Sequence, residues 1–207
     1  SLIFFFRKHI VITLNCEKNG RKCGQTKFSG LSARLVAGGV AIMVSPNLVN
    51  HIQNFDFDLE GRLISLVVKI HDVDIQFVNV YMSNDAKERK NFIENDIQNY
   101  ISKSNVVIGG DFNFVENTSL DKLGGNDLYG NIGTKGIASL KSSYSLVDVY
   151  REIYPNVKSY TWSSSSVKCR LDRFYISKEL INFVTNISNY PSLKSDHDIV
   201  LLSFDNL

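Results

Sequence analysis

The sequence contains few cysteines, few prolines and no long apolar run. Its three cysteines, Cys16, Cys23 and Cys169, form an odd set without the paired spacing of a zinc site. They indicate neither a disulfide framework nor a structural zinc centre, and they favour a reducing compartment. No apolar stretch reaches the ~18 residues of a membrane-spanning helix, which argues against a membrane protein. Three prolines, set against thirteen Phe and nine Tyr, favour a sheet-rich fold.

Acidic residues are scarce at the beginning of the chain. Residues 1–35 hold seven Lys or Arg against Glu17 alone, although the net charge of the chain is only +2. Such a segment could lie along a phosphate backbone, or it could be a solvated arm. The chain starts at Ser1, and the apolar run at 2–6 is too short for a signal peptide. We therefore expect a truncated or processed start.

The length and composition suit one globular domain. With 207 residues, 43% of them apolar, the chain can bury a substantial core, and a second domain is not needed. We divide it into a basic, partly irregular N-terminal segment, residues 1–37, and a folded domain, residues 38–207.

Apolar runs predict most of the strands. Runs typical of buried strands lie at 10–14, 38–44, 63–70, 74–81, 106–110, 170–176 and 199–204. The short connection between the third and fourth predicts an antiparallel hairpin. Helical spacing of apolar residues predicts a helix over 85–101, which would cross to a parallel strand at 106, and a short helix over 135–142. Residues 17–34 and the glycine-rich stretch 116–134 are expected to be loops with little to pack, and the serines at 163–166 a hairpin turn.

The segment 106–113, VVIGGDFN, joins a buried strand to two polar side chains. Side chains two residues apart on an extended backbone point the same way, so Asp111 and Asn113 are expected on one face, with Phe112 on the other. The two glycines leave the backbone bare, which would let a phosphodiester approach closely. A carboxylate that accepts a proton from water and an amide that binds phosphate oxygen suit phosphoester hydrolysis. A simple turn is the alternative.

Polar residues follow other predicted strands in the same manner. They are Tyr81 with Asn84, Asp172, and Asp196 with His197. A sheet that gathers these strand ends at one edge would bring them together in a cleft.

Each of these residues also has a simpler interpretation. Asp172 lies between two arginines and could form an ion pair with either, and Asn84 could belong to the N-cap of the following helix. Asp196 and His197 could form a turn. Both can serve one site only if 195–198 is a loop, because neighbours on a strand face opposite ways.

Five motifs occur in an order known from a protein superfamily. They are NVYMSN at 79–84, GGDFN at 109–113, YTW at 160–162, RLDRFYIS at 170–177 and SDHDIV at 195–200, with GGVAIMVS at 38–45 as a further match. Together they resemble the endonuclease/exonuclease/phosphatase superfamily and, within it, the apurinic-type endonuclease domain of non-LTR (LINE-type) retrotransposons. The resemblance implies a DNase I-like α/β sandwich, in which two mixed or mostly antiparallel sheets pack face to face with helices outside.

The resemblance implies a catalytic role for several matching residues. Asp111 would orient or deprotonate the attacking water, and Asn113 would hold a non-bridging phosphate oxygen. His197 would stabilise the charge of the phosphorane, and Asp172 would be hydrogen-bonded to His197 and fix its tautomer.

Other matching residues would surround the phosphate. Tyr81 and Asn84 would face the scissile phosphate, and Thr161 would supply a backing hydroxyl. Asp196 would belong to the site of Mg²⁺ (or Mn²⁺), a hard cation that neutralises phosphate charge and polarises the leaving oxygen.

The N-terminal part departs from the pattern of this superfamily. There an asparagine ends the first strand, and a glutamate on the second is the principal metal ligand. Asn15 matches the asparagine, but too few residues separate it from Gly38 to hold the intervening helix and glutamate strand. Glu17 is the only acid before Asp56. We therefore expect an incomplete N-terminal portion and weakened Mg²⁺ binding.

The leading hypothesis is metal-dependent cleavage of DNA phosphodiesters by a monomeric protein, as in the strand nicking that primes retrotransposition. Its place would be inside the cell, and in the nucleus if the chain derives from a retrotransposon. Two alternatives stay open. The chain could be an inactive remnant that still binds nucleic acid through residues 1–35 and the cleft, or a phosphatase of small or lipid phosphoesters.

Overall fold

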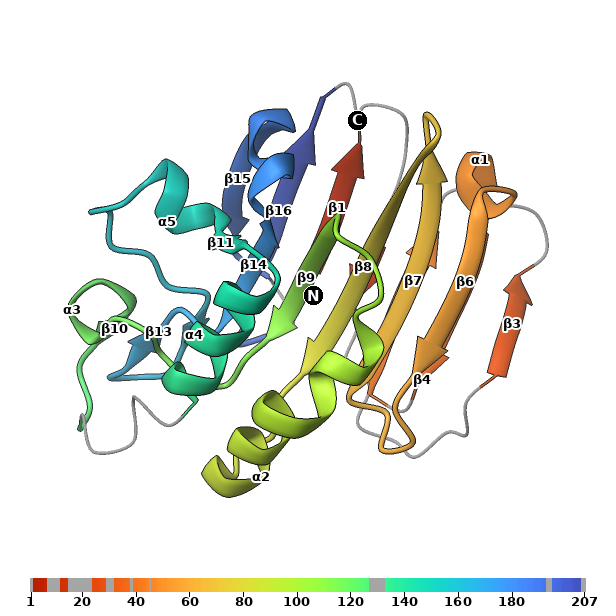
Figure 1. Ribbon diagram of the computed structural model, residues 1–207. Helices are drawn as coiled ribbons and strands as arrows, with labels where there is room; N and C mark the ends of the chain where they lie inside the picture. Colours follow the sequence, from red (N-terminus) through yellow and green to blue (C-terminus); the bar gives the residue numbers. More distant parts are fainter. Residues whose placement is uncertain are drawn as a thin grey trace.

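The computed structural model in Figure 1 describes most of the backbone. Outside the described residues lie 1, 7–11, 15–23, 29–31, 38, 45, 127–132, 193–194 and 206–207, and side chains are described for 39–44, 48–126, 133–192 and 195–205. The predictions about Glu17, Asn15, two of the cysteines and the basic side chains of 1–37 lie outside this part and stay predictions.

A six-stranded mixed sheet forms the centre of the molecule. In spatial order its strands are β11 (Leu146–Asp148), β14 (Asp172–Ser177), β9 (Val106–Asp111), β8 (Val73–Tyr81), β7 (Leu63–Ile70) and β6 (Ile52–Phe57). β8 and β9 run parallel, and the other neighbouring pairs are antiparallel. The predicted hairpin of β7 and β8 and the predicted parallel crossover to β9 are both confirmed.

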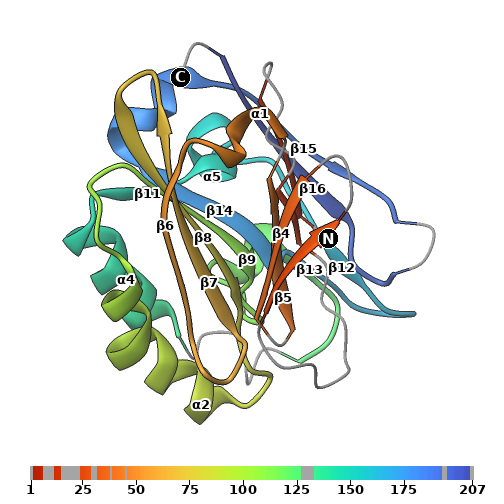
Figure 2. The same ribbon diagram turned by 90° about the vertical axis from the view of Figure 1, so that its right-hand side faces the viewer.

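Two smaller sheets face this central sheet. One contains β15 (Val184–Tyr190), β16 (Ile199–Phe204), β1 (Leu2–Phe6) and β2 (Ile12–Leu14), and the other contains β3 (Gly24–Phe28), β4 (Ser32–Ala37) and β5 (Val40–Val44). Figure 2 shows these strands as a layer on one side of the central sheet, with α2 and α4 on the opposite side. The predicted α/β sandwich is confirmed.

A continuous helical segment covers the outer face of the central sheet. It begins as α2 (Ala86–Asn91) and continues as a π-helical turn, η1 (Phe92–Asp96), and a 3-10 turn, η2 (Ile97–Tyr100). Beside it lies α4 (Thr134–Ser143), and both predicted helices are therefore confirmed. The shorter helices are α1 (Pro46–Val49), α3 (Thr118–Asp121), α5 (Val149–Ile153) and the 3-10 helix η4 (Lys178–Phe183). Among the described residues, no helix combines the length and apolarity that crossing a membrane requires.

The central sheet is buried on both faces. Because side chains alternate along a strand, Phe77 of β8 packs into the core between the sheets, whereas Val78 packs against the helices. The same alternation separates Val107 from Ile108 on β9. Burial of both faces explains the continuous apolar runs of the sequence.

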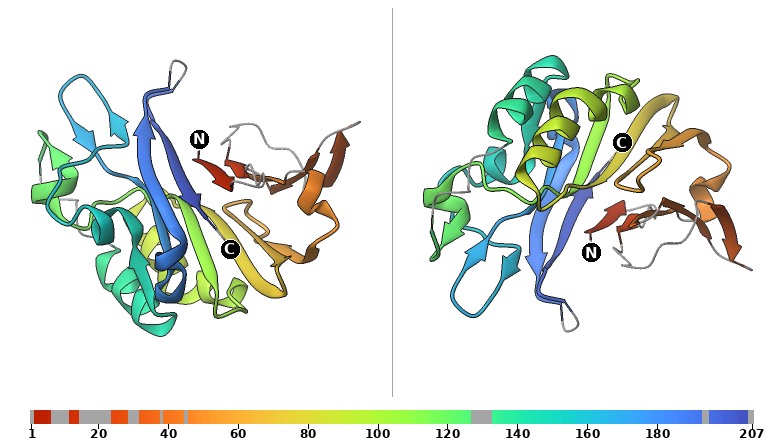
Figure 3. Two further views of the ribbon diagram at one scale, coloured as in Figure 1. Left: turned by 90° about the horizontal axis from the view of Figure 1, so that it is seen from above. Right: turned by 90° about the horizontal axis from the view of Figure 1, so that it is seen from below.

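A small fourth sheet lies to one side of the two main layers, as the end-on views of Figure 3 show. It contains β10 (Lys122–Leu123), β13 (Lys168–Cys169) and β12 (Trp162–Ser163). β12 and β13 are antiparallel and are joined through the serine run, so the predicted hairpin turn is confirmed.

Two predictions about elements are wrong, and one strand was not predicted. Residues 17–34, expected to be a loop, contain β3 and the start of β4, which pair with each other and continue to β5. β6 was not anticipated, since it is a mostly exposed edge strand without an apolar run. The stretch 116–126 does pack, because the carboxylate of Asp121 in α3 is fully buried among arginines.

Candidate active site

Three strands of the central sheet place polar side chains at one edge. β9 ends at Asp111, which lies opposite Asp172 at the start of antiparallel β14. On its other side, Asp111 pairs with Tyr81 at the end of parallel β8. The strand register alone therefore brings together three residues that are far apart in the sequence.

Asp111 and Asn113 lie side by side, but a turn and not an extended strand places them so. The strand ends at Asp111, and Asn113 adopts a left-handed backbone conformation with φ of 52°. The Asn113 backbone N–H donates to Oδ1 of Asp111 over 2.9 Å, and its Nδ2 donates to Oδ2 of Asp111 over 3.2 Å and to the carbonyl of Met82 over 2.6 Å. Asparagine tolerates this conformation better than most residues do. Phe112 points the other way into the core, as predicted.

The imidazole of His197 lies between two carboxylates. Its Nδ1 is 2.8 Å from Oδ2 of Asp172, and its Nε2 is 3.9 Å from Oδ2 of Asp111. The buried hydroxyl of Thr161 donates to the same Asp172 oxygen over 2.7 Å and accepts the backbone N–H groups of Leu171 and Asp172. Asp172 is thus fixed in orientation and directed at His197, and its position is not explained by pairing with the flanking arginines.

The segment that carries His197 is not a regular strand. His197 forms an isolated bridge with Trp162, and the backbone N–H of Asp198 donates to the carbonyl of Thr161 over 2.6 Å. The indole Nε1 of Trp162 donates to Oδ2 of Asp196 over 2.7 Å. The Asp196 carboxylate is therefore bound to Trp162 and is not part of the group formed by Asp111, Asp172 and His197.

The sequence assigned no role to Trp162, and its place in the YTW motif is the only signal of its importance. A second contributor, the backbone carbonyl of Met82, has no sequence signal, because any residue supplies a carbonyl. Trp162 binds Asp196, and the Met82 carbonyl binds Asn113, so each contacts a residue that the sequence did single out.

Burial and mutual charge shift the protonation of the group. Burial and the charge of Asp172 raise the pKa of Asp111 to about 7. Burial by itself lowers the pKa of His197, but the hydrogen bond and charge of Asp172 outweigh it, and the pKa of His197 is raised. The imidazole therefore keeps its proton to a higher pH than an ordinary histidine does, and Asp111 can both take up and release a proton near neutral pH.

Tyr81 ends β8, and Asn84 lies on the connection from β8 to α2. Tyr81 is half-buried at the end of β8, and Asn84 is exposed. Asp85 caps the helix, because its Oδ1 accepts the N–H groups of Lys87 and Glu88, each over 2.9 Å. The N-cap residue is thus Asp85 and not Asn84.

The match to known proteins covers most of the chain. Residues 8–197 match the Endonuclease/Exonuclease/phosphatase family. The chain belongs to this family. The resemblance drawn from the motifs is thereby confirmed. The uncharacterized 149 kDa protein of transposon TX1 from Xenopus laevis is 26% identical over 210 residues, which cover 98% of this chain and 16% of that protein.

Solved structures of nucleases share the fold of this family member. The AP endonuclease LMAP from Leishmania major matches with a TM-score of 0.65 at 17% identity, over 78% of this chain and 65% of that one. An AP endonuclease from Archaeoglobus fulgidus matches with a TM-score of 0.62 at 20% identity, over 84% and 79%. The endonuclease domain of TRAS1, a telomere-specific non-LTR retrotransposon, matches with a TM-score of 0.57 at 13% identity, over 86% and 75%.

Members of the Endonuclease/Exonuclease/phosphatase family generally depend on a divalent metal ion, and the donor atoms here suit one in part. Ligand atoms of Asp111, Asp172 and His197 all lie within 4.8 Å of one another. A charged imidazole is a poor ligand, and the carboxylates of Asp111, Asp172 and Asp196 each accept a hydrogen bond already. Asp111 and Asp196 are less buried than Asp172, and Mg²⁺ commonly takes only one or two protein carboxylates beside water and phosphate.

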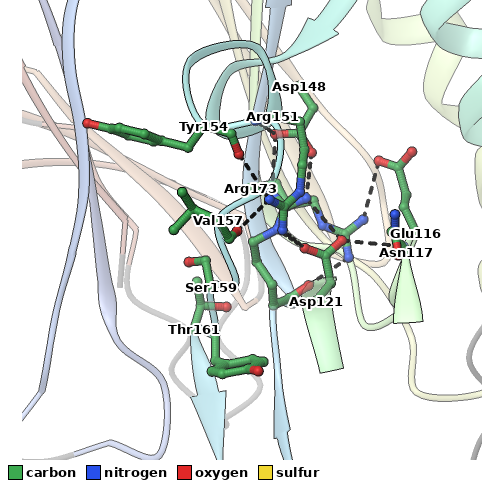
Figure 4. A network of polar contacts seen from close by, with 12 residues as sticks. Glu116, Asn117, Asp121, Asp148, Arg151, Tyr154, Val157, Ser159, Thr161 and Arg173 are labelled. Atoms are coloured by element: carbon green, nitrogen blue, oxygen red, sulfur yellow. Dashed lines mark hydrogen bonds and ion pairs between the residues drawn. The ribbon is translucent and has the colours of Figure 1, made fainter. Parts of the chain in front are cut away.

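A buried network of charged side chains holds the segment that leads into β14, as Figure 4 shows. Nε of Arg170 donates to Oδ1 of Asp121 over 2.7 Å, and its Nη2 donates to Oδ2 of Asp148 over 2.7 Å. Arg151 pairs with Asp121 as well. Burial raises the pKa of Asp121, but its bonds to the arginines outweigh this and lower the pKa. The network ties α3, β11 and α5 to the residue two positions before Asp172.

Arg173 performs a similar function on the other side of Asp172. Its guanidinium is fully buried and donates to the carbonyl of Phe114, to the carbonyl of Arg170 over 2.7 Å and to the hydroxyl of Tyr175 over 3.1 Å. The loop that follows Asn113 is therefore attached to β14.

The two glycines before Asp111 serve packing rather than access. A Cβ on Gly109 would lie 2.3 Å from the ring of Phe174, and one on Gly110 would lie 1.9 Å from the carbonyl oxygen of Val80. The space beside these glycines, expected to admit a phosphodiester, is filled by Phe174 and Val80. The expected reason for the glycines is therefore wrong, and close approach between strands replaces it.

Proposed function

We propose that the chain is a metal-dependent phosphodiesterase that nicks DNA, as in target-site cleavage by a retrotransposon endonuclease. The observation that carries the proposal is the arrangement of His197 between Asp172 and Asp111 at the edge of the sheet. Family membership and the transposon relative support the substrate class. A DNA substrate of this kind would place the protein in the nucleus, which imaging of a tagged chain can check.

In this proposal, Asp111 and His197 act on the same phosphate from neighbouring positions, since Nε2 of His197 lies 3.9 Å from Oδ2 of Asp111. Asp111 orients and deprotonates the attacking water, for which a pKa of about 7 is well suited near neutral pH. His197 is held in its charged form by Asp172 and stabilises the negative charge that develops on the phosphoryl oxygens. Thr161 keeps Asp172 directed at the imidazole.

Asn113 first orients Asp111 and then binds phosphate. Both N–H groups of its amide are engaged, one by Met82 and one by Asp111. The bond to Asp111 is the longer of the two, so it is the one that a phosphate oxygen would replace. Tyr81 and Asn84 would contact the phosphate from the neighbouring connection. A divalent cation, when bound, neutralises phosphate charge and polarises the leaving oxygen, and Asp196 would hold it.

Nicking of supercoiled plasmid tests the proposal. The purified chain is incubated with plasmid and Mg²⁺, Mn²⁺ or EDTA, next to Asp111→Ala and the exposed control Asp72→Ala. We expect open circles with either metal, none with EDTA, and a loss of about 100-fold or more for Asp111→Ala only. Salt-sensitive DNA retention without nicking would instead identify an inactive DNA-binding remnant. Release of phosphate from small or lipid phosphoesters without nicking would identify a phosphatase.

A further inference from the structure

Arg89 is the buried basic residue of α2. Only 3% of the surface of Arg89 is exposed, whereas Lys87 and Lys90 on the same helix are exposed. The sequence predicts all three on the polar outer face. Burying a guanidinium is costly unless its donors and its charge are satisfied, so its contacts should show what it stabilises.

The guanidinium of Arg89 holds the turn that precedes α2. Its Nη1 donates to the carbonyl oxygen of Ser83 over 2.8 Å and to that of Asn84 over 3.2 Å. Its backbone N–H donates to the carbonyl of Asp85 over 3.0 Å. Burial lowers the pKa of Arg89, and the charges of Asp85 and Asp111 oppose this only in part. One buried side chain thus binds two successive carbonyls of the turn.

The same turn is bonded to the candidate active site. The backbone N–H of Met82 donates to the carbonyl of Asp111 over 2.8 Å, and the carbonyl of Met82 accepts Nδ2 of Asn113 over 2.6 Å. Met82 is fully buried and directly precedes Ser83. A continuous series of contacts therefore leads from Arg89 through the turn to the amide of Asn113.

We propose that Arg89 is a positioning residue, which fixes the turn 82–85 so that the Met82 carbonyl holds the Asn113 amide against Asp111 and Asn84 faces the substrate. This inference rests on the proposed function. Arg89 touches none of the reacting atoms and acts through Met82 and Asn113. A displacement of about 1 Å in such a group can cost up to about 100-fold in rate, even when substrate binding is preserved.

Arg89→Lys is the informative variant, because it keeps the charge and loses the planar guanidinium, whose Nη1 reaches both carbonyls. Arg89→Met removes the charge as well, and Lys90→Met is the exposed control on the same helix. In the nicking assay we expect Arg89→Lys to lower kcat by about tenfold or more with KM within about twofold, while Lys90→Met resembles the wild type. A thermal midpoint close to that of the wild type would exclude unfolding as the cause.

A second readout does not depend on cleavage. In ¹H–¹⁵N NMR spectra of Arg89→Lys, the side-chain amide of Asn113 and the backbone amide of Met82 should shift, while the side-chain amide of Asn186, exposed on β15, stays in place. Unchanged Asn113 and Met82 signals would overturn the proposal, as would unchanged kcat in an active enzyme. If the wild type cleaves nothing, the proposed function fails, and the NMR shifts still decide the positioning role.

Discussion

At the scale of single residues, the candidate site is a compromise between stability and chemistry. Two carboxylates and an imidazole share a small, largely buried volume, which raises the pKa of Asp111 to about 7 through burial and the charge of Asp172. Such a group is costly to the fold and useful to a reaction that needs a base near neutral pH.

Asp111→Asn should make the protein more stable at neutral pH. The folded carboxyl keeps its proton up to about pH 7, whereas the unfolded one loses it near ~3.9. Between these values the folded state binds more protons, so the free energy of unfolding falls as pH rises. The variant should lose this decline and gain about 1–2 kcal/mol at pH 7.5. Urea denaturation at pH 4.5 and 7.5 measures it, and an undiminished decline in Asp111→Asn would contradict the account.

Thr161→Val should weaken both the fold and the proposed reaction. The hydroxyl donates to Asp172 and accepts two backbone N–H groups, and valine has the same shape without these bonds. We expect a loss of about 1–3 kcal/mol in the free energy of unfolding, because buried polar groups are left without partners. Thr161→Ser keeps the hydroxyl and should lose much less. Equal losses for the two variants would show that the methyl group, and not the hydrogen bonds, is what matters.

At the scale of elements, the packing of β9 against β8 and β14 requires residues without side chains at Gly109 and Gly110. Gly110→Ala should therefore be strongly destabilising. Its Cβ would meet the carbonyl of Val80, and its φ of 154° is rarely adopted by other residues. Backbone strain and overpacking together predict a loss of about 2–4 kcal/mol. Denaturant unfolding measures it beside the control Ser165→Ala in the exposed hairpin turn. A loss below that of ordinary surface substitutions would refute the packing role.

Removing one carboxylate from the buried charge network beside β14 should cost much more stability than removing one from a surface ion pair. Asp121→Ala leaves Arg170 buried with half of its partners, which predicts a loss of about 3–5 kcal/mol. Glu60→Ala removes the exposed partner of Arg62 and should cost less than about 1 kcal/mol. Thermal or urea unfolding of the two variants makes the comparison. Similar costs would mean that burial does not set the importance of this network.

Elements with a strong apolar pattern were predictable, and those formed by pairing alone were not. β7, β8, β9 and β16 are apolar runs that a two-sided core requires. β3 is largely polar in sequence and β6 is mostly exposed, and each pairs with a neighbouring strand through backbone hydrogen bonds. The burial of Asp121 was equally hidden, since its partners Arg151 and Arg170 come from later parts of the chain.

At the scale of the whole molecule, the sandwich gathers strand ends at one edge. The sequence motifs predicted that Asp111, Asp172 and His197 meet there, whereas Asp196, predicted to join them, is bound to Trp162 instead. The sequence could not predict the left-handed turn at Asn113, the bond from Trp162 to Asp196, or the buried guanidinium of Arg89. These depend on contacts between segments whose distance in space no local pattern encodes.

The central claim is that this edge of the sheet is a phosphodiester-cleaving site, and the nicking rate of His197→Ala tests it most directly. His51→Ala is the matched control, because His51 is exposed and its described hydrogen bonds are made by its backbone N–H and carbonyl groups. The account predicts that His197→Ala loses about 100-fold or more of the nicking rate while His51→Ala stays within about twofold of the wild type. Nicking by His197→Ala at the wild-type rate would contradict it.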